Sequence, residues 1–169
     1  GCAVPTSGGI SNVYYSVGII PFGFVSDRGR WKLETVIAGQ ALVTLAANNT
    51  WYTSLNNHGS IVIPPGSWKI GYEWNIVNQS TVGGNRSVFC VLSSSTPSTT
   101  YAINNLATHP VVYGGGVAMV SALSKSAFIN LSSATTYIPY FASDAITGTD
   151  TTGFNNGGLS TTFAEPAGV

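Results

Sequence analysis

Hydrophobic and polar residues alternate most regularly between Trp68 and Ile76. Successive side chains of a β-strand point to opposite faces, so a strand here has one face made only of large apolar side chains. These side chains are Trp68, Ile70, Tyr72, Trp74 and Ile76. The other face carries Lys69, Gly71, Glu73 and Asn75. The pattern predicts a strand that packs its aromatic face into a core.

Shorter apolar or alternating runs, each ended by Gly, Pro, Asn or Ser, recur along the chain and predict further strands. They cover residues 14–25, 31–37, 60–63, 87–92, 111–113, 117–120, 137–141 and 159–163. Residues 93–100 and 147–158 are rich in turn-forming residues and predict loops. Segments 38–48 and 119–128 hold Ala and Leu at spacings that suit a short helix as well as a strand. The pattern predicts an all-β fold, either a sandwich or a barrel.

Charged residues are scarce. They make up 7% of the chain, against an average of about 25% in soluble domains. The net charge is zero, which gives little repulsion between copies and favours association. The few Lys and Arg residues form no basic face, so we expect no nucleic acid partner. The length of 169 residues predicts a single domain, and no apolar stretch is long enough for membrane insertion.

The sequence offers little for catalysis or metal binding. It has six carboxylates, and no two lie at a helical spacing that would pair them for acid–base work. Asp144 and Asp150 flank a Thr/Gly loop that suits Ca²⁺ only weakly, because its spacing is not that of an EF-hand. His58 and His109 have no metal-ligand partner nearby in sequence. We therefore predict no enzyme activity, no catalytic residues, no metal and no cofactor.

The two cysteines, Cys2 and Cys90, are far apart in sequence. Either they form a disulfide, or Cys90 is buried in a strand and Cys2 is incidental. The candidate recognition loop is residues 99–109, which combine a ring, two amides and an imidazole in one segment. Its candidate binding residues are Tyr101, Asn104, Asn105 and His109.

Three segments resemble virion proteins of bacteriophages. From Gln40 to Ile76 the chain reads A-L-V-T-L-A-A-N-N-T-W and then S-I-V-I-P-P-G-S-W-K-I-G-Y-E-W. The strand A-T-T-Y-I-P-Y-F-A from Ala134 and the closing G-G-L-S-T-T-F from Gly157 resemble later strands of the same proteins. Together the segments resemble the TNF/C1q-like jelly roll of phage fibres and heads, over roughly residues 35–165. Pro139 departs from the pattern, and so does the last strand, which lacks a basic ending.

The resemblance implies a homotrimer in which one sheet of each subunit packs about a three-fold axis. It places the strands 68–76 and 137–141 in that sheet, so the implied interface residues are Tyr72, Trp74, Tyr137 and Phe141. Residues 35–169 form the jelly-roll domain in this interpretation. Residues 1–34 match no known pattern and form either an N-terminal arm or an extra hairpin.

The function expected from composition and resemblance is that of a virion structural protein on the particle surface. It forms the trimeric head of a phage fibre, spike or capsid projection, contacts other virion proteins and attaches to a host-surface glycan or protein. Two alternatives stay open: a capsid decoration protein without receptor binding, and a non-viral lectin or adhesin. A sandwich fold alone does not choose among them.

Overall fold

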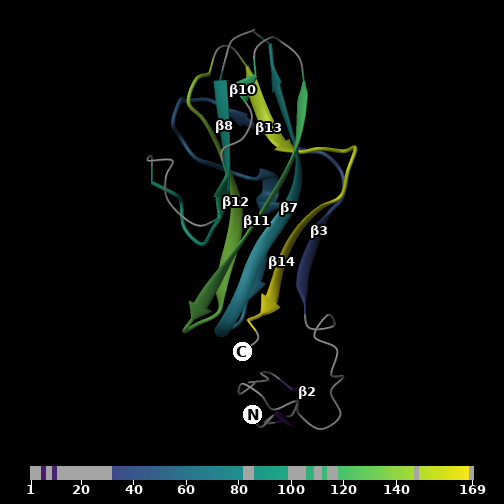
Figure 1. Cartoon of the computed structure of the whole chain (residues 1–169), viewed down its shortest axis with the longest axis vertical. Helices are drawn as coiled ribbons and strands as arrows, with labels where there is room; N and C mark the ends of the chain where they lie inside the picture. The colour runs from purple at the N-terminus through teal and green to yellow at the C-terminus, as the bar shows by residue number, and fades with distance from the viewer. Residues whose placement is uncertain are drawn as a thin grey trace.

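The computed structural model describes residues 5–6, 9–10, 32–81, 86–98, 106–108, 112–113, 118–146 and 149–167. The predicted strand at 14–25 lies outside these residues, and the division of the chain near residue 34 stays a prediction. Two six-stranded antiparallel sheets make up the main body of the protein, and they pack face to face as a sandwich (Figure 1). A separate two-stranded ladder joins β1 (Pro5–Thr6) to β2 (Gly9–Ile10).

The first sheet is built around β7 (Gly66–Ser80), its longest strand. Along one edge β7 pairs over almost its whole length with β11 (Met119–Leu131). Its other edge is shared by β14 (Ser160–Pro166) and β13 (Asp150–Phe154). Outside these lie β3 (Leu33–Ile37), paired with β14, and β4 (Ala41–Leu45), paired with β13.

The second sheet is centred on β12 (Thr135–Ser143) and β8 (Arg86–Ser93). The outer edge of β12 pairs with β6 (Ile61–Ile63) and β5 (Tyr52–Thr53). The outer edge of β8 pairs with β9 (Ala107–Thr108) and β10 (Val112–Tyr113). One turn of 3₁₀-helix, η2 (Leu55–Asn57), is the only helical element in the described part of the chain.

The strand order identifies the fold as a jelly roll. The first sheet contains the order β3–β14–β7–β11 and the second the order β6–β12–β8–β9. The chain crosses between the sheets so that its first and last sandwich strands, β3 and β14, lie side by side. This is the double Greek-key arrangement of eight-stranded jelly rolls, with β4 and β13 extending the first sheet. The predicted all-β antiparallel sandwich is confirmed.

The helical interpretations of segments 38–48 and 119–128 are wrong. Residues 41–45 form β4, and residues 119–131 form β11, which pairs with β7 at every residue. Tertiary pairing with a strong neighbour decides the conformation here, because Ala- and Ser-rich segments have little preference of their own. The predicted loop at 147–158 also contains a strand, β13, which fills the upper part of the β7 edge.

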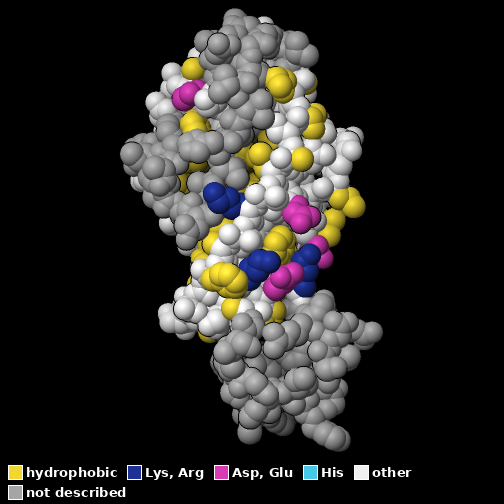
Figure 2. Space-filling view, viewed as in Figure 1, with side chains coloured by type: hydrophobic (Ala, Val, Ile, Leu, Met, Phe, Trp, Pro, Cys, Tyr) yellow, Lys and Arg dark blue, Asp and Glu magenta, His cyan; other side chains and the backbone are white. Residues whose placement is uncertain are grey.

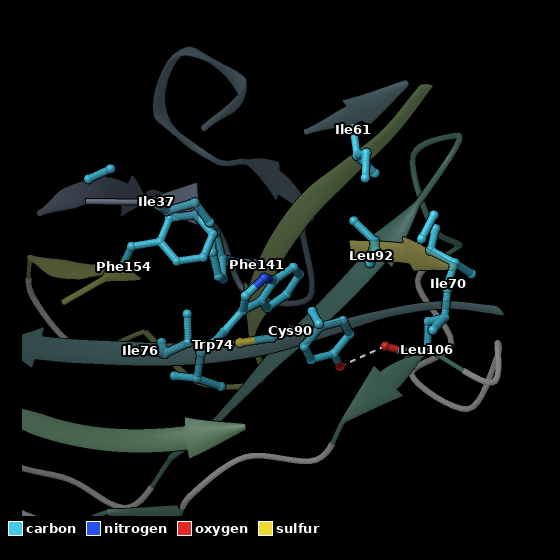
Figure 3. Close-up of a cluster of buried hydrophobic side chains, with 14 of the residues drawn as sticks. Ile37, Ile61, Ile70, Trp74, Ile76, Cys90, Leu92, Leu106, Phe141 and Phe154 are labelled. Carbon is cyan, nitrogen blue, oxygen red and sulfur yellow. Dashed lines mark hydrogen bonds between the residues drawn. The ribbon is translucent and has the colours of Figure 1, made fainter. Parts of the chain in front are cut away.

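Aromatic rings from both sheets meet in the core. Trp74 stacks on Tyr72 with 3.8 Å between ring centroids, and its edge meets Phe154 at 5.6 Å. Phe141 of the second sheet lies 5.7 Å from Phe154 and 6.4 Å from Trp74. Figure 3 shows Trp74, Phe141 and Phe154 close together in the core, near Ile76, Cys90 and other apolar side chains. The strict alternation predicted for residues 68–76 is thus confirmed: its aromatic face is the core face.

Pro139 does not break the second sheet. It pairs with Leu92 of β8, and its carbonyl accepts a hydrogen bond from the Ser54 backbone N–H at 2.9 Å. The N and O of one residue in an antiparallel strand point to the same side. The missing N–H of Pro139 therefore falls on the edge where the pairing passes from β6 to β5, so no bond to β8 is lost.

Candidate interaction surface

The solvent side of the first sheet is the broadest surface built from described strands, and we call it the outer face. Residues directly opposite each other in an antiparallel pair point to the same side, so the register fixes which residues belong to it. From β3, β14 and β7 these are Glu34, Val36, Thr161, Phe163, Glu165, Lys69, Gly71, Glu73 and Asn75; Val77 points the same way but is only 3% exposed. From β11, β13 and β4 they are Val120, Ala122, Ser124, Ser126, Phe128, Thr151, Gly153, Leu42 and Thr44.

Apolar side chains are concentrated at this surface. The described residues contain six large hydrophobic side chains that are exposed, and four of them lie on or beside the outer face. Val36 and Val120 are 55% and 54% exposed, and Phe128 and Leu159 are 74% and 75% exposed. The other two, Leu55 and Val62, belong to η2 and β6. These four side chains lie on the same side of the protein, separated by polar residues such as Glu73 and Ser124, so this side is the most apolar one among the described residues.

Gly71 leaves room for the Phe163 ring on the outer face. A Cβ added at this position would come within 2.7 Å of the Phe163 ring and of the Lys125 carbonyl oxygen. The Lys32 ammonium lies 4.8 Å from the centroid of the same ring, a cation–π contact. Phe163 is thus held between the sheet backbone below and a cation above.

Two ion pairs lie near this ring. Lys32 Nζ is 3.0 Å from Glu34 Oε1, and Lys69 Nζ is 3.9 Å from Glu165 Oε2. Figure 2 shows positively and negatively charged side chains close together over the lower half of the described surface, among apolar ones. Both pairs are solvent-exposed, so each contributes at most about 1 kcal/mol to stability. Their larger effect is to leave the lower part of the outer face locally neutral.

A shallow groove of about 340 Å³ crosses the outer face where β7 and β11 run together. Glu73, Asn75 and Ser124 give it polar groups, and Ala122 and Leu159 give it apolar walls. Leu159 comes from residues 155–159, which bulge out between β13 and β14 (Figure 1). This excursion is anchored to β7 because Ser160 Oγ accepts a hydrogen bond from the Asn75 backbone N–H at 2.8 Å.

The structure corrects the predicted interface residues. Strands β7 and β12 lie in opposite sheets, so the two predicted strands do not share one face. Tyr72, Trp74 and Phe141 are at most 1% exposed and fill the core of the subunit, which leaves them no surface to offer a neighbour. Tyr137 is half-buried on β12, opposite Ile61. The side chains of β7 that face outward are instead the polar ones of the alternating pattern, such as Lys69, Glu73 and Asn75. The sequence analysis places them opposite the aromatic face but does not name them as interface residues.

The predicted recognition residues Tyr101, Asn104, Asn105 and His109 lie outside the described residues. Residues 106–108 of their segment are described: Leu106 is 4% exposed, and its carbonyl accepts a hydrogen bond of 2.8 Å from the Tyr72 hydroxyl (Figure 3). Residues 107–108 form β9, which pairs with β8, so these three residues are fixed to the core.

The remaining polar candidates have structural partners. Asp144 Oδ1 accepts a hydrogen bond from the Ser87 backbone N–H at 2.7 Å. Asp150, the first residue of β13, is only 2% exposed. Among the residues described, no three His, Cys, Asp or Glu side chains come together to hold a metal ion. Cys90 is a buried thiol in β8, and burial raises the pKa of this thiol far above its usual range. This confirms the predicted buried strand cysteine; Cys2 lies outside the described residues.

No helix in the described part of the chain has the length and apolar character needed to cross a membrane.

Comparison with known proteins gives neither a family nor a curated relative: no family model matches the chain, and no curated protein does. Among solved structures it is similar to a chain of the infectious bursal disease virus T13 particle, with 12% identity and a TM-score of 0.39, over 92% of this chain and 40% of that one. It is also similar to the VP2 protein of that virus in derived T=1 particles, with 13% identity and a TM-score of 0.40, over 98% of this chain and 44% of that one. The chain thus spans less than half the length of these neighbours, and likenesses this weak assign it no function.

Proposed function

We propose that this protein is a structural subunit of a virus particle and that it assembles with copies of itself through the outer face. The observation that carries the proposal is that four of the six exposed large hydrophobic side chains of the described residues lie on the same side of one sheet of a jelly roll. Charge is scarce, at 7% of residues, so little electrostatic repulsion opposes contact between copies.

The size of the outer face suits a stable contact. With a rise of about 3.3 Å per residue and a spacing of about 4.8 Å between strands, a face as long as β7 and four strands wide covers about 900 Å². A specific protein interface of standard size buries about 800 Å² on each partner. The outer face is therefore large enough to serve as an interface by itself.

The finer parts of the proposal rest on the sequence resemblance. The segments 40–76, 134–142 and 157–163 resemble TNF/C1q-like domains of phage virion proteins, which implies a homotrimer at the head of a fibre, spike or capsid projection. Attachment to a host-surface glycan or protein follows from the same resemblance, with residues 99–109 as the recognition loop. The location we propose is the surface of the virion.

The first test measures assembly. Sedimentation of the purified chain at micromolar concentration should give three times 17.5 kDa. Phe128→Ser should shift it to the monomer without loss of thermal stability, because this ring is 74% exposed and adds little to the subunit core. Val62→Ser is the matched control: Val62 is 63% exposed but belongs to the second sheet, so assembly should persist. A wild-type monomer would overturn the proposal.

The second test addresses attachment. Labelled trimer should bind cells of the host, and purified surface glycan should compete with this binding if a glycan is the ligand. Binding to virus capsids without any binding to cells would replace attachment by decoration. Phe128→Ser serves here as the monomeric reference, since a trimer presents three copies of each loop and should bind cells more tightly.

A further inference from the structure

Two charged side chains of opposite sign are left without a partner once the others are accounted for. Nine charged residues lie in the described part of the chain, and the side chains of eight of them are described. Four form the pairs Lys32–Glu34 and Lys69–Glu165. Asp144 accepts a hydrogen bond from Ser87, and Asp150 is buried with an interaction of its own. Within the described residues this leaves Glu73 and Lys125, both exposed, one anionic and one cationic.

These two groups leave the sheet on opposite sides, and no ion pair joins them within the subunit. Glu73 lies directly opposite Ser124 on the outer face. Lys125 is the next residue of β11 and lies opposite Tyr72, whose side chain faces the core. Successive side chains of a strand leave from opposite sides, so the Lys125 side chain starts on the core-facing side of β11. It remains exposed there, on the strand that forms one edge of the first sheet.

Glu73 is set in the groove of the outer face, between the polar groups of Asn75 and Ser124 and the apolar walls of Ala122 and Leu159. Such a site suits a lysine side chain that belongs to another copy of the protein. Its methylene stem can lie along apolar walls while its ammonium reaches a carboxylate. Among the charged side chains that the structure describes, the one unmatched anion lies in a groove and the one unmatched cation lies at an edge, so the two are complementary.

We propose that Lys125 of one copy inserts into the groove of the next copy and pairs with Glu73. The contact joins the edge of one sandwich, formed by β11, to the outer face of another, so it is heterologous: the two copies contribute different surfaces. This deepens the proposed function, because it rests on self-assembly through the outer face and names the residues that set its geometry.

The type of contact restricts the symmetry. A two-fold contact uses the same patch on both partners, whereas an edge-to-face contact repeats head to tail and either closes into a ring or grows as a filament. Each copy in such a ring gives one lysine and receives one. Closure after three copies agrees with the trimer proposed above.

Charge reversal tests the pairing. Glu73→Lys and Lys125→Glu should each lower the apparent association constant at least tenfold in sedimentation experiments, and the double variant should recover most of that loss. Val62→Lys is the control: it adds a positive charge at an exposed position of the second sheet, away from the outer face. Its assembly should stay close to that of the wild type.

Salt supplies a second measurement. An exposed ion pair between copies is screened as ionic strength rises, so assembly of the wild type should weaken with added NaCl, and that of Glu73→Gln should respond less. If single reversals assemble like the wild type, or the double variant is no better than either single one, the pairing is refuted while self-assembly stands. If the wild type itself is monomeric, the proposed function fails first, which keeps the two failures distinct.

Discussion

Removal of the Trp74 ring is the most direct test of the core. This side chain is 1% exposed, stacks on Tyr72 at 3.8 Å and meets the rings of Phe154 and Phe141. Its indole N–H donates a hydrogen bond of 3.1 Å to Thr162 Oγ1 of β14. Trp74→Ala therefore removes contacts to both sheets and to the neighbouring strand in one change.

The expected loss follows from these contacts. Replacing a buried Trp or Phe by Ala typically costs about 3–5 kcal/mol, and a ring pair adds about 0.5–1.5 kcal/mol beyond the area it buries. With three rings in contact we place Trp74→Ala near the upper end, at about 5 kcal/mol. Tyr72→Ala should cost about 3–5 kcal/mol for the same reason. Typical domains have a stability of about 5–15 kcal/mol, so either variant should be close to unfolding.

Equilibrium unfolding in urea, followed by far-ultraviolet circular dichroism at one fixed protein concentration, measures this loss. The concentration must be fixed because self-association adds to apparent stability. Trp68→Ala is the matched control: it lies on the same strand and the same face, but it is half-buried and donates to the Pro64 carbonyl near the surface. It should cost clearly less. Equal losses for Trp74→Ala and Trp68→Ala, or a loss below about 2 kcal/mol for Trp74→Ala, would refute the assignment of Trp74 to the centre of the core.

Two further predictions concern single positions. Gly153→Ala should destabilise the protein by about 1–3 kcal/mol, because the added Cβ would collide with the Ala41 carbonyl oxygen in the adjacent strand. Thermal melting measures this loss. The control Gly157→Ala, at an exposed glycine, should lower the melting temperature much less. In a Cys2→Ser background, the Cys90 thiol should react with a disulfide reagent only as fast as the protein unfolds, because burial raises its pKa. The folded state holds this proton more tightly, so stability should fall as pH rises above the ordinary thiol pKa of about 8.5; fast labelling of the folded protein at neutral pH would contradict this.

The sequence predicted β7 well because its pattern is unambiguous. Every core-facing residue from Trp68 to Ile76 is large and apolar, and the structure buries four of these five. β11 lacked such a signal. Its core-facing positions include Ser121 and the exposed Lys125, and its identity as a strand comes from its pairing with β7. β13, with the sequence Asp-Thr-Thr-Gly-Phe, is likewise held by its two neighbours.

The position of the candidate surface could not be predicted from alternation alone. The pattern of residues 68–76 shows that two faces exist, but not that β12 lies in the other sheet, which is a matter of topology. The resemblance placed both strands together and so assigned core rings to the interface. The charges left over in β7 and β11 become apparent only when the register and the ion pairs are both known.

The break between β13 and β14 divides the first sheet into two parts with different flanking strands. β3 and β14 accompany β7 only along its first half, and β4 and β13 only along its last residues. β7 and β11 alone run through both parts, so they act as the common spine of two short flanking pairs. Insertions or deletions in the five-residue segment 155–159 can then change the shape of the outer face, while the pairing of β13 and β14 with β7 keeps its register. Residues 155–159 are therefore a position where sequence changes can alter the binding surface without changing the fold.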